Sequence, residues 1–205
     1  MLDIVSTADV ALADLELFAD HVGSQFEVSV SKSQIHLRSV DPPSWATLLA
    51  EAPWWIQGLG AAAALYVAEL VKEAAKETWR ERAKVLGTVK TAGNRLGKLA
   101  EGLVDLRNRL SAPTTLGIGL PVPSEFFPTH LAIEGNGLEE VTAQLALFVH
   151  HLPALSRLLS EQGAAERAAT GVHLELQDDG ALSVWWHDRE TLAVNRHLLD
   201  PHDSV

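Results

Sequence analysis

Histidines and carboxylates are the side chains of this sequence best suited to chemistry, because it contains no cysteine. Nine histidines occur, and His150 and His151 are adjacent in a segment with helical periodicity. Adjacent helical side chains point about 100° apart, so this pair is poorly placed to chelate a metal. The segment HLLDPHD, residues 197–203, gathers two histidines and two aspartates without the H-E-x-x-H spacing of a helical zinc site. We therefore predict no bound metal and no cofactor.

Motifs for phosphate binding and for nucleophilic catalysis are incomplete. The segment GNRLGKL, residues 93–99, resembles a Walker loop, but it lacks one residue of the required spacing and the Ser or Thr after the lysine. No G-x-S-x-G elbow occurs, and without cysteine the nucleophile would be a serine, a threonine or a carboxylate. These patterns favour a non-catalytic protein. A hydrolase-type enzyme with an unrecognised site ranks third among the interpretations.

Two aromatic features indicate contact with a partner. The loop LPVPSEFFPT, residues 120–129, is stiffened by three prolines and places Phe126 and Phe127 beside Glu125. Apolar rings in a surface loop are typical of an interaction site, and the alternative is that both rings fold back onto the core. Trp185 is adjacent to Trp186 in a predicted strand, so one ring faces the core and the other is exposed or covered by a helix. We predict Glu125, Phe126, Phe127 and Trp185 as partner-binding residues.

The charge is acidic overall and unevenly distributed. The 205 residues carry a formal net charge of -11, and residues 54–110 form the one basic block, with 10 basic and 6 acidic side chains. An acidic chain repels phosphate backbones at long range, so we predict no nucleic-acid binding. The same acidic surface favours a basic protein partner, which would suit an immunity protein or an adaptor.

The chain composition is that of a globular protein, with 47% hydrophobic and 21% charged residues, and it fits a single domain over residues 1–205. The absence of cysteine fits a reducing compartment. The first sixteen residues contain three aspartates and no basic residue, unlike the basic start of a signal peptide. These features predict a cytoplasmic protein.

Hydrophobic periodicity predicts strands near both ends of the chain and helices grouped between them. We predict an α+β fold in which N-terminal, middle and C-terminal hairpins form one antiparallel sheet packed on a long central helical block. The hairpins pair residues 26–30 with 35–39, 114–120 with 129–135, and 172–176 with 182–186. Helices are predicted for residues 9–22, 41–53, 54–110 and 137–162, with Pro153 expected to kink or split the last one.

The helical block 54–110 is too long to be one rod in a compact domain. At about 1.5 Å per residue it would exceed about 80 Å, whereas a domain of this size is about 40 to 45 Å across. We therefore expect a chain reversal within residues 85–97, where three glycines weaken the helix. Apolar residues nevertheless keep heptad spacing from Val85 to Leu110, so a homodimer formed through helix 85–110 stays open as an alternative.

A charge-free stretch of 17 residues, 52–68, approaches the length needed to cross a bilayer. Alanines and glycines dominate it, and these residues contribute little to membrane insertion. We favour a helix in a soluble protein, in which Gly60, Ala64 and Ala68 form a buried stripe of small residues. The second-ranked function is a membrane-associated or membrane-inserting protein that uses the apolar helix 53–71.

Overall fold

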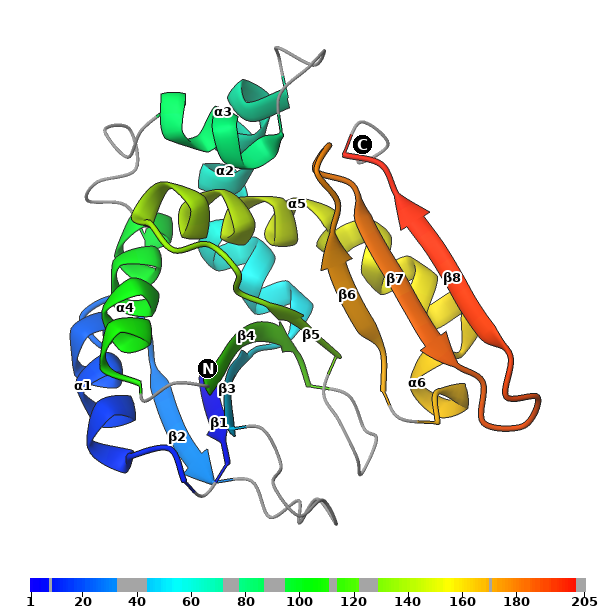
Figure 1. The fold of residues 1–205 in the computed structure, drawn as a ribbon, viewed down its shortest axis with the longest axis horizontal. Coiled ribbons are helices and arrows are strands. Elements are labelled where there is room, and N and C mark those ends of the chain that lie inside the picture. Colours follow the sequence, from blue (N-terminus) through cyan, green and yellow to red (C-terminus); the bar gives the residue numbers. More distant parts are fainter. Residues whose placement is uncertain are drawn as a thin grey trace.

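The computed structural model describes residues 1–7, 9–32, 44–71, 78–86, 95–110, 114–121, 129–169 and 171–201. These residues form one eight-stranded sheet with helices packed against it (Figure 1). The strands are β1 (Leu2–Ser6), β2 (Val28–Lys32), β3 (Ser44–Leu49), β4 (Thr114–Leu120), β5 (Thr129–Ala132), β6 (His173–Leu176), β7 (Leu182–His187) and β8 (Val194–Leu199). The helices are α1 (Leu12–Val22), α2 (Ala52–Val71), α3 (Trp79–Leu86), α4 (Arg95–Arg109), α5 (Leu138–Gln162) and α6 (Ala164–Arg167).

The sheet is mixed, and its strand order is β2-β1-β3-β4-β5-β6-β7-β8. The pairs β1/β2, β3/β4 and β5/β6 are parallel, and the other neighbours are antiparallel. Each parallel pair is joined by a helical crossover: α1 for the first, α2 to α4 for the second, and α5 with α6 for the third. The protein is α+β, but the prediction of an antiparallel sheet of hairpins on one long helical block is wrong, because the helices are divided among crossovers that parallel pairing requires.

Two of the predicted hairpins are confirmed. The middle hairpin is the antiparallel pair β4/β5, with Ile118 opposite Leu131. The C-terminal hairpin is β6/β7, and its turn contains Gly180 at φ 90°, a conformation that glycine adopts without strain. In the N-terminal region the first predicted arm is β2, which pairs in parallel with β1. The second predicted arm, residues 35–39, lies outside the described residues.

The predicted helix over residues 41–53 is wrong in its described part, because Ser44–Leu49 forms strand β3. This strand lies between β1 and β4 in the sheet. Its residues Ala46 to Leu49 are buried on both faces, so the strand lacks the alternation of polar and apolar side chains that marks a half-exposed strand.

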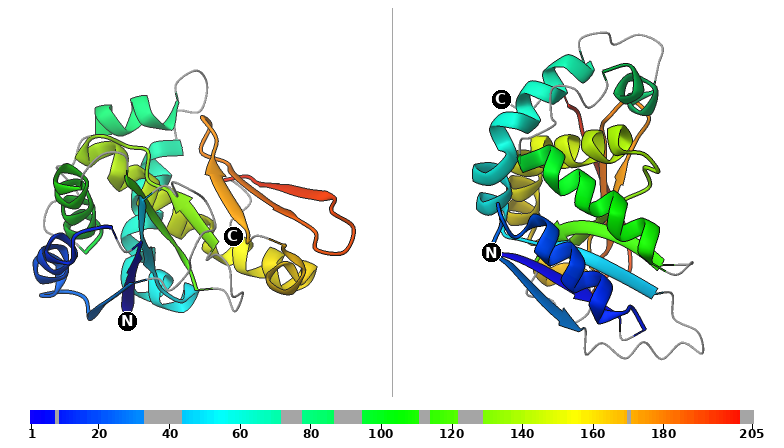
Figure 2. Two further views of the ribbon diagram at one scale, coloured as in Figure 1. Left: turned by 60° about the horizontal axis from the view of Figure 1, so that its bottom comes forward. Right: turned by 90° about the vertical axis from the view of Figure 1, so that its left-hand side faces the viewer.

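The central helical block is divided into the separate helices α2, α3 and α4. Helix α4 lies beside α1 (Figure 2), and a Cβ atom at Gly102 would be only 3.0 Å from side-chain atoms of Phe18 and Val22. The apolar residues of α4 that continue the predicted heptad spacing are buried within this chain, namely Leu96, Leu99, Leu103 and Leu106. Of the kink or split expected at Pro153, the split does not occur, because α5 continues through this residue as one helix.

Helix α2 buries most of its described large apolar side chains, with Ile56 and Leu65 as exposed exceptions, while the predicted small-residue stripe lies mainly outside the core. Trp55, Leu59 and Tyr66 lie in the core, whereas Ala64 and Ala68 are exposed. The prediction that the small-residue stripe is buried is therefore wrong. Burial of large apolar side chains removes more apolar surface from water than burial of alanines, and this difference sets the rotation of the helix about its axis.

The orientation of α2 gives a paired stability test with neighbouring alanines. Ala63 is fully buried and Ala64 is exposed. Ala63→Leu is expected to lower the free energy of unfolding by about 1 to 3 kcal/mol through overpacking. Ala64→Leu is expected to change it by less than about 0.5 kcal/mol. Urea unfolding of both variants measures the difference, and equal losses would contradict this orientation.

None of the described helices combines the length and the apolar character needed to cross a membrane. Residues 52–68 of α2 carry no charge, and the inward side of this helix packs in the protein core through Trp55, Leu59 and Val67.

Candidate functional site

The two faces of the sheet differ in what covers them. Side chains alternate between faces along each strand, and one set lies in the core beneath the helices, including Ile4, Leu48, Ile118, Leu174 and Val184. Much of the opposite set is half-buried or exposed, including Asp3, Val5, Trp45, His130, His173, Trp185 and Arg196. On the same side Thr47, Leu49, Gly117, Gly119 and Ser183 are buried. We call this second side the open face. In Figure 1 strands β6 to β8 lie in front of α6 and the end of α5, so their open face is turned toward the viewer.

A row of aromatic and basic side chains crosses the open face at one level. The register places His130 of β5 opposite His173 of β6, His173 opposite Trp185 of β7, and Trp185 opposite Arg196 of β8. Residues directly opposite on neighbouring strands have Cβ atoms about 4.5 to 5.5 Å apart, so neighbouring side chains in this row lie within reach of one another.

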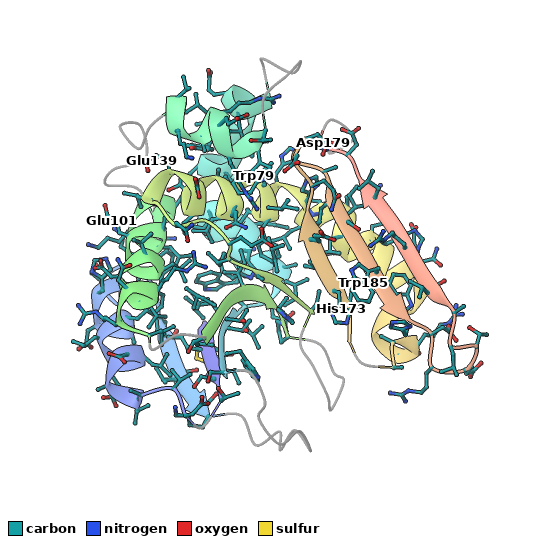
Figure 3. The ribbon with its side chains drawn as sticks, in the orientation of Figure 1. Trp79, Glu101, Glu139, His173, Asp179 and Trp185 are labelled. Carbon is teal, nitrogen blue, oxygen red and sulfur yellow. The ribbon has the colours of Figure 1, made fainter. Side chains whose placement is uncertain are left out.

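Trp185 is the centre of this row (Figure 3). Its ring stacks on the His173 ring with centroids 4.1 Å apart and planes at 15°. The His187 ring, two residues along the same strand, meets it edge-on at 5.8 Å and 84°. The tryptophan is half-buried, so part of its surface faces solvent between these rings. This arrangement holds a large apolar surface in a fixed orientation.

The electrostatics of the row depend on its histidines and on Arg196. Partial burial, followed by the neighbouring His130 and His187, lowers the pKa of His173 below its ordinary value. His173 is therefore neutral near pH 7, and its stacking on Trp185 is that of two neutral rings. Arg196 is exposed and forms no ion pair or hydrogen bond with any residue that the structure describes. The arginine supplies a fixed positive charge at one end of the row.

Exposed apolar side chains flank the Arg196 end of the row on strand β8. Val194 and Leu198, which flank Arg196 at two-residue spacing on β8, are 57% and 64% exposed. Leu192, in the loop before β8, is 74% exposed. A cluster of exposed aliphatic side chains beside a fixed tryptophan is typical of a surface that another molecule covers.

The loop between β7 and β8 is fixed by Asp188, which is only 2% exposed. Its carboxylate accepts hydrogen bonds from the backbone N–H groups of Glu190 and Thr191 at 3.0 and 2.9 Å, and from the Arg167 Nε at 2.9 Å. The bonds from Thr191 and Arg167 lower the pKa of Asp188 to about 2. The start of β8, and with it the rim of the open face, is therefore held in place by an ionised carboxylate.

The adjacent histidines on α5 have structural roles. His150 donates from Nε2 to the carbonyl oxygen of Pro201 at 2.7 Å, and His151 donates from Nε2 to that of Gly180 at 2.8 Å. Both imidazoles therefore attach α5 to the same end of the β6–β8 region, where the turn between β6 and β7 lies beside the end of β8. Within the described part of the chain no three His, Asp or Glu side chains are grouped to hold a metal ion. Of the segment 197–203, residues 202 and 203 lie outside that part.

The predicted site residues have different outcomes. Trp186 is buried and Trp185 lies on the open face, as the alternation of the strand predicts. Glu125, Phe126 and Phe127 lie outside the described residues, so their role stays a prediction. Sequence reasoning missed the other members of the row, His130, His173, His187 and Arg196. The available signal was the alternation of side chains along a strand. His173 and Trp185 each lie one position from a buried residue, Leu174 or Val184, and so point to the other face of the sheet.

Comparisons with known proteins do not extend these observations. No family model matches the chain, and no curated protein or solved structure gives a significant match. The functional argument therefore depends on the geometry of the open face.

Proposed function

We propose that the protein acts by binding another protein through the open face around Trp185, without catalysing a reaction. The observation that carries this proposal is a half-buried tryptophan, fixed between two histidine rings and bordered by the exposed Val194 and Leu198. Tryptophan and arginine are over-represented among residues that dominate binding energy, and here Trp185 and Arg196 are direct neighbours. Pre-ordered side chains also lose little entropy on binding.

The charge of the chain supports a protein partner with a basic surface. The net charge of -11 attracts a basic protein at long range and repels nucleic acid. The open face itself carries Arg196 and three histidines, so the part of the partner that lies directly on it is expected to be apolar or acidic. We place this function in the cytoplasm, a proposal that the lack of cysteine supports.

The test is the affinity of a partner captured with the wild-type protein. Trp185→Ala is expected to weaken binding by about 2 kcal/mol, roughly thirtyfold, because a central anchor ring is lost. The control variant is Leu65→Ala on the outward side of α2, where Leu65 is 74% exposed. Isothermal titration calorimetry with each variant measures the effect. Unchanged affinity for Trp185→Ala, with binding lost in the control, would contradict the proposal.

A second candidate function is contact with a membrane surface through the outward side of α2. Exposed Leu65 lies there with Ala64 and Ala68, and residues 52–68 contain no charged side chain. Shallow insertion of such a side does not require the helix to span the bilayer. Flotation with lipid vesicles tests it: this candidate predicts that the protein floats and that Leu65→Asp abolishes flotation.

A further inference from the structure

We propose that β8 accepts an extended segment of the partner as an added strand, and that this segment carries an acidic residue flanked at two-residue spacing by apolar residues. This inference rests on the proposed function, because it specifies the chemistry of the partner that covers the open face. Addition of a strand to a sheet edge is a common mode of peptide recognition, in which backbone hydrogen bonds supply affinity and alternate side chains supply specificity.

The backbone of β8 is available for such pairing. Within the described residues β8 pairs only with β7 and ends the sheet. The N–H of Asp188 donates to the carbonyl oxygen of Ala193 at 2.9 Å, so these residues form a hydrogen-bonded pair of the antiparallel ladder. Hydrogen-bonded and non-hydrogen-bonded pairs alternate along such a ladder. The N–H and C=O groups of Val194, Arg196 and Leu198 therefore point away from β7.

The same three residues also project their side chains onto the open face, because Arg196 is opposite Trp185 and the side chains of β8 alternate. A strand added along β8 would place its own alternate side chains beside Val194, Arg196 and Leu198. Apolar residues complement the two exposed aliphatic side chains, and a carboxylate complements the arginine between them. The arginine has no ion pair with a described residue, so an incoming carboxylate meets no competitor among them.

The two outermost described strands differ in how they are protected. Strand β2 ends in Lys32, which donates to the carbonyl oxygens of Thr7 and Val10, and Ser29 donates to the carboxylate of Asp3. Edge lysines are a common protection against unwanted strand pairing. Residues 194–199 contain neither lysine nor proline, and their exposed aliphatic side chains favour pairing. The comparison assigns strand addition to β8.

The experiment is selection of displayed heptapeptides by the intact protein. Each peptide contains the five-residue pattern apolar-x-Z-x-apolar, and Z is varied over all residues. Glutamate or aspartate at Z is expected to be enriched about fivefold over lysine with the wild-type protein. Arg196→Glu is expected to invert this preference. Leu198→Pro removes an N–H that points away from β7, so the sheet is retained while peptide selection is lost. The same preference at Z in the wild type and in Arg196→Glu would overturn the inference, as would full selection by Leu198→Pro.

The outcomes separate this inference from the proposed function. Trp185→Ala could lose the captured partner while Arg196→Glu leaves the residue preference at Z unchanged. In that case the proposed function stands and strand addition at β8 is wrong. Arg196→Glu could invert the preference at Z while the captured partner binds Trp185→Ala with unchanged affinity. In that case the captured partner does not bind the open face around Trp185. A dimer of the free protein that Leu198→Pro abolishes would assign the edge to a second copy and would also overturn the inference.

Discussion

Trp55→Ala is expected to lower the free energy of unfolding by about 3 to 5 kcal/mol, the range typical of removing a large buried aromatic side chain. Trp55 has no exposed surface and joins three elements. It lies on α2, its ring meets Phe148 of α5 edge-on at 5.6 Å, and its Nε1–H donates to the carbonyl oxygen of Gly119 in β4 at 3.1 Å. Truncation leaves a cavity where the helices meet the sheet.

Trp55→Phe separates the hydrogen bond from the packing. Phenylalanine retains much of the apolar volume but loses the donor to Gly119, so we expect a smaller loss of about 1 to 3 kcal/mol. Urea unfolding followed by circular dichroism measures both variants at constant pH. A loss below about 1 kcal/mol for the alanine variant would contradict the position of Trp55 in the core.

Acidification from pH 6.5 to pH 4 is expected to lower the free energy of unfolding by about 3 kcal/mol through His151 alone. Burial is the main cause that lowers the pKa of His151 from 6.5 to about 4. The hydrogen bond to Gly180 and the nearby Asp179 and Asp200 partly oppose this shift, and the His150 ring adds to it. The Nδ1 atom is buried without a hydrogen-bond partner among the described residues.

The sign follows from proton binding. Between pH 6.5 and pH 4 the unfolded chain binds a proton at His151 and the folded chain does not, so stability falls as pH falls through this window. The contribution is fully present above about pH 6.5 and is lost below about pH 4.

His151→Gln isolates this contribution, because glutamine keeps an N–H donor but does not titrate in this window. The difference in pH dependence between wild type and variant, measured by urea unfolding from pH 7 to pH 4, is expected to be about 3 kcal/mol. His150→Gln is the matched control on the neighbouring half-buried position. Parallel curves for wild type and His151→Gln would contradict the neutral, buried state of His151.

Local signals were sufficient for the C-terminal part of the sheet. The segment Asp178–Gly180 marks a turn between two alternating stretches, and the structure forms the hairpin β6/β7 there. The adjacent Trp185 and Trp186 divide between the open face and the core because strand side chains alternate. Adjacent antiparallel strands need only a short turn, so the sequence between them carries the information.

The parallel pairs could not be predicted in this way. Strands β1 and β2 are separated by α1, and β3 and β4 by three helices, so their pairing depends on contacts distant in sequence. Strand β3 also lacks alternation, because both Thr47 and Leu48 are buried. A continuous apolar segment of this length does not distinguish a buried strand from a helix.

The candidate site was predicted in part for the same reason. Trp185 stands out as a single residue, but His130, Trp185 and Arg196 come from three strands distant in sequence. Only the register of the sheet places them in one row. For helix α2 the spacing of its small residues was apparent, but its rotation depends on the larger side chains, such as Trp55, that fill the core.

The most direct test of the open face as the binding surface is hydrogen–deuterium exchange with and without the captured partner. Bound partner is expected to slow exchange in residues 182–199, which include β7 and β8, and most strongly at the outward N–H groups of Val194, Arg196 and Leu198. Slowed exchange confined to residues 52–71 of α2, with none in β7 or β8, would contradict the account.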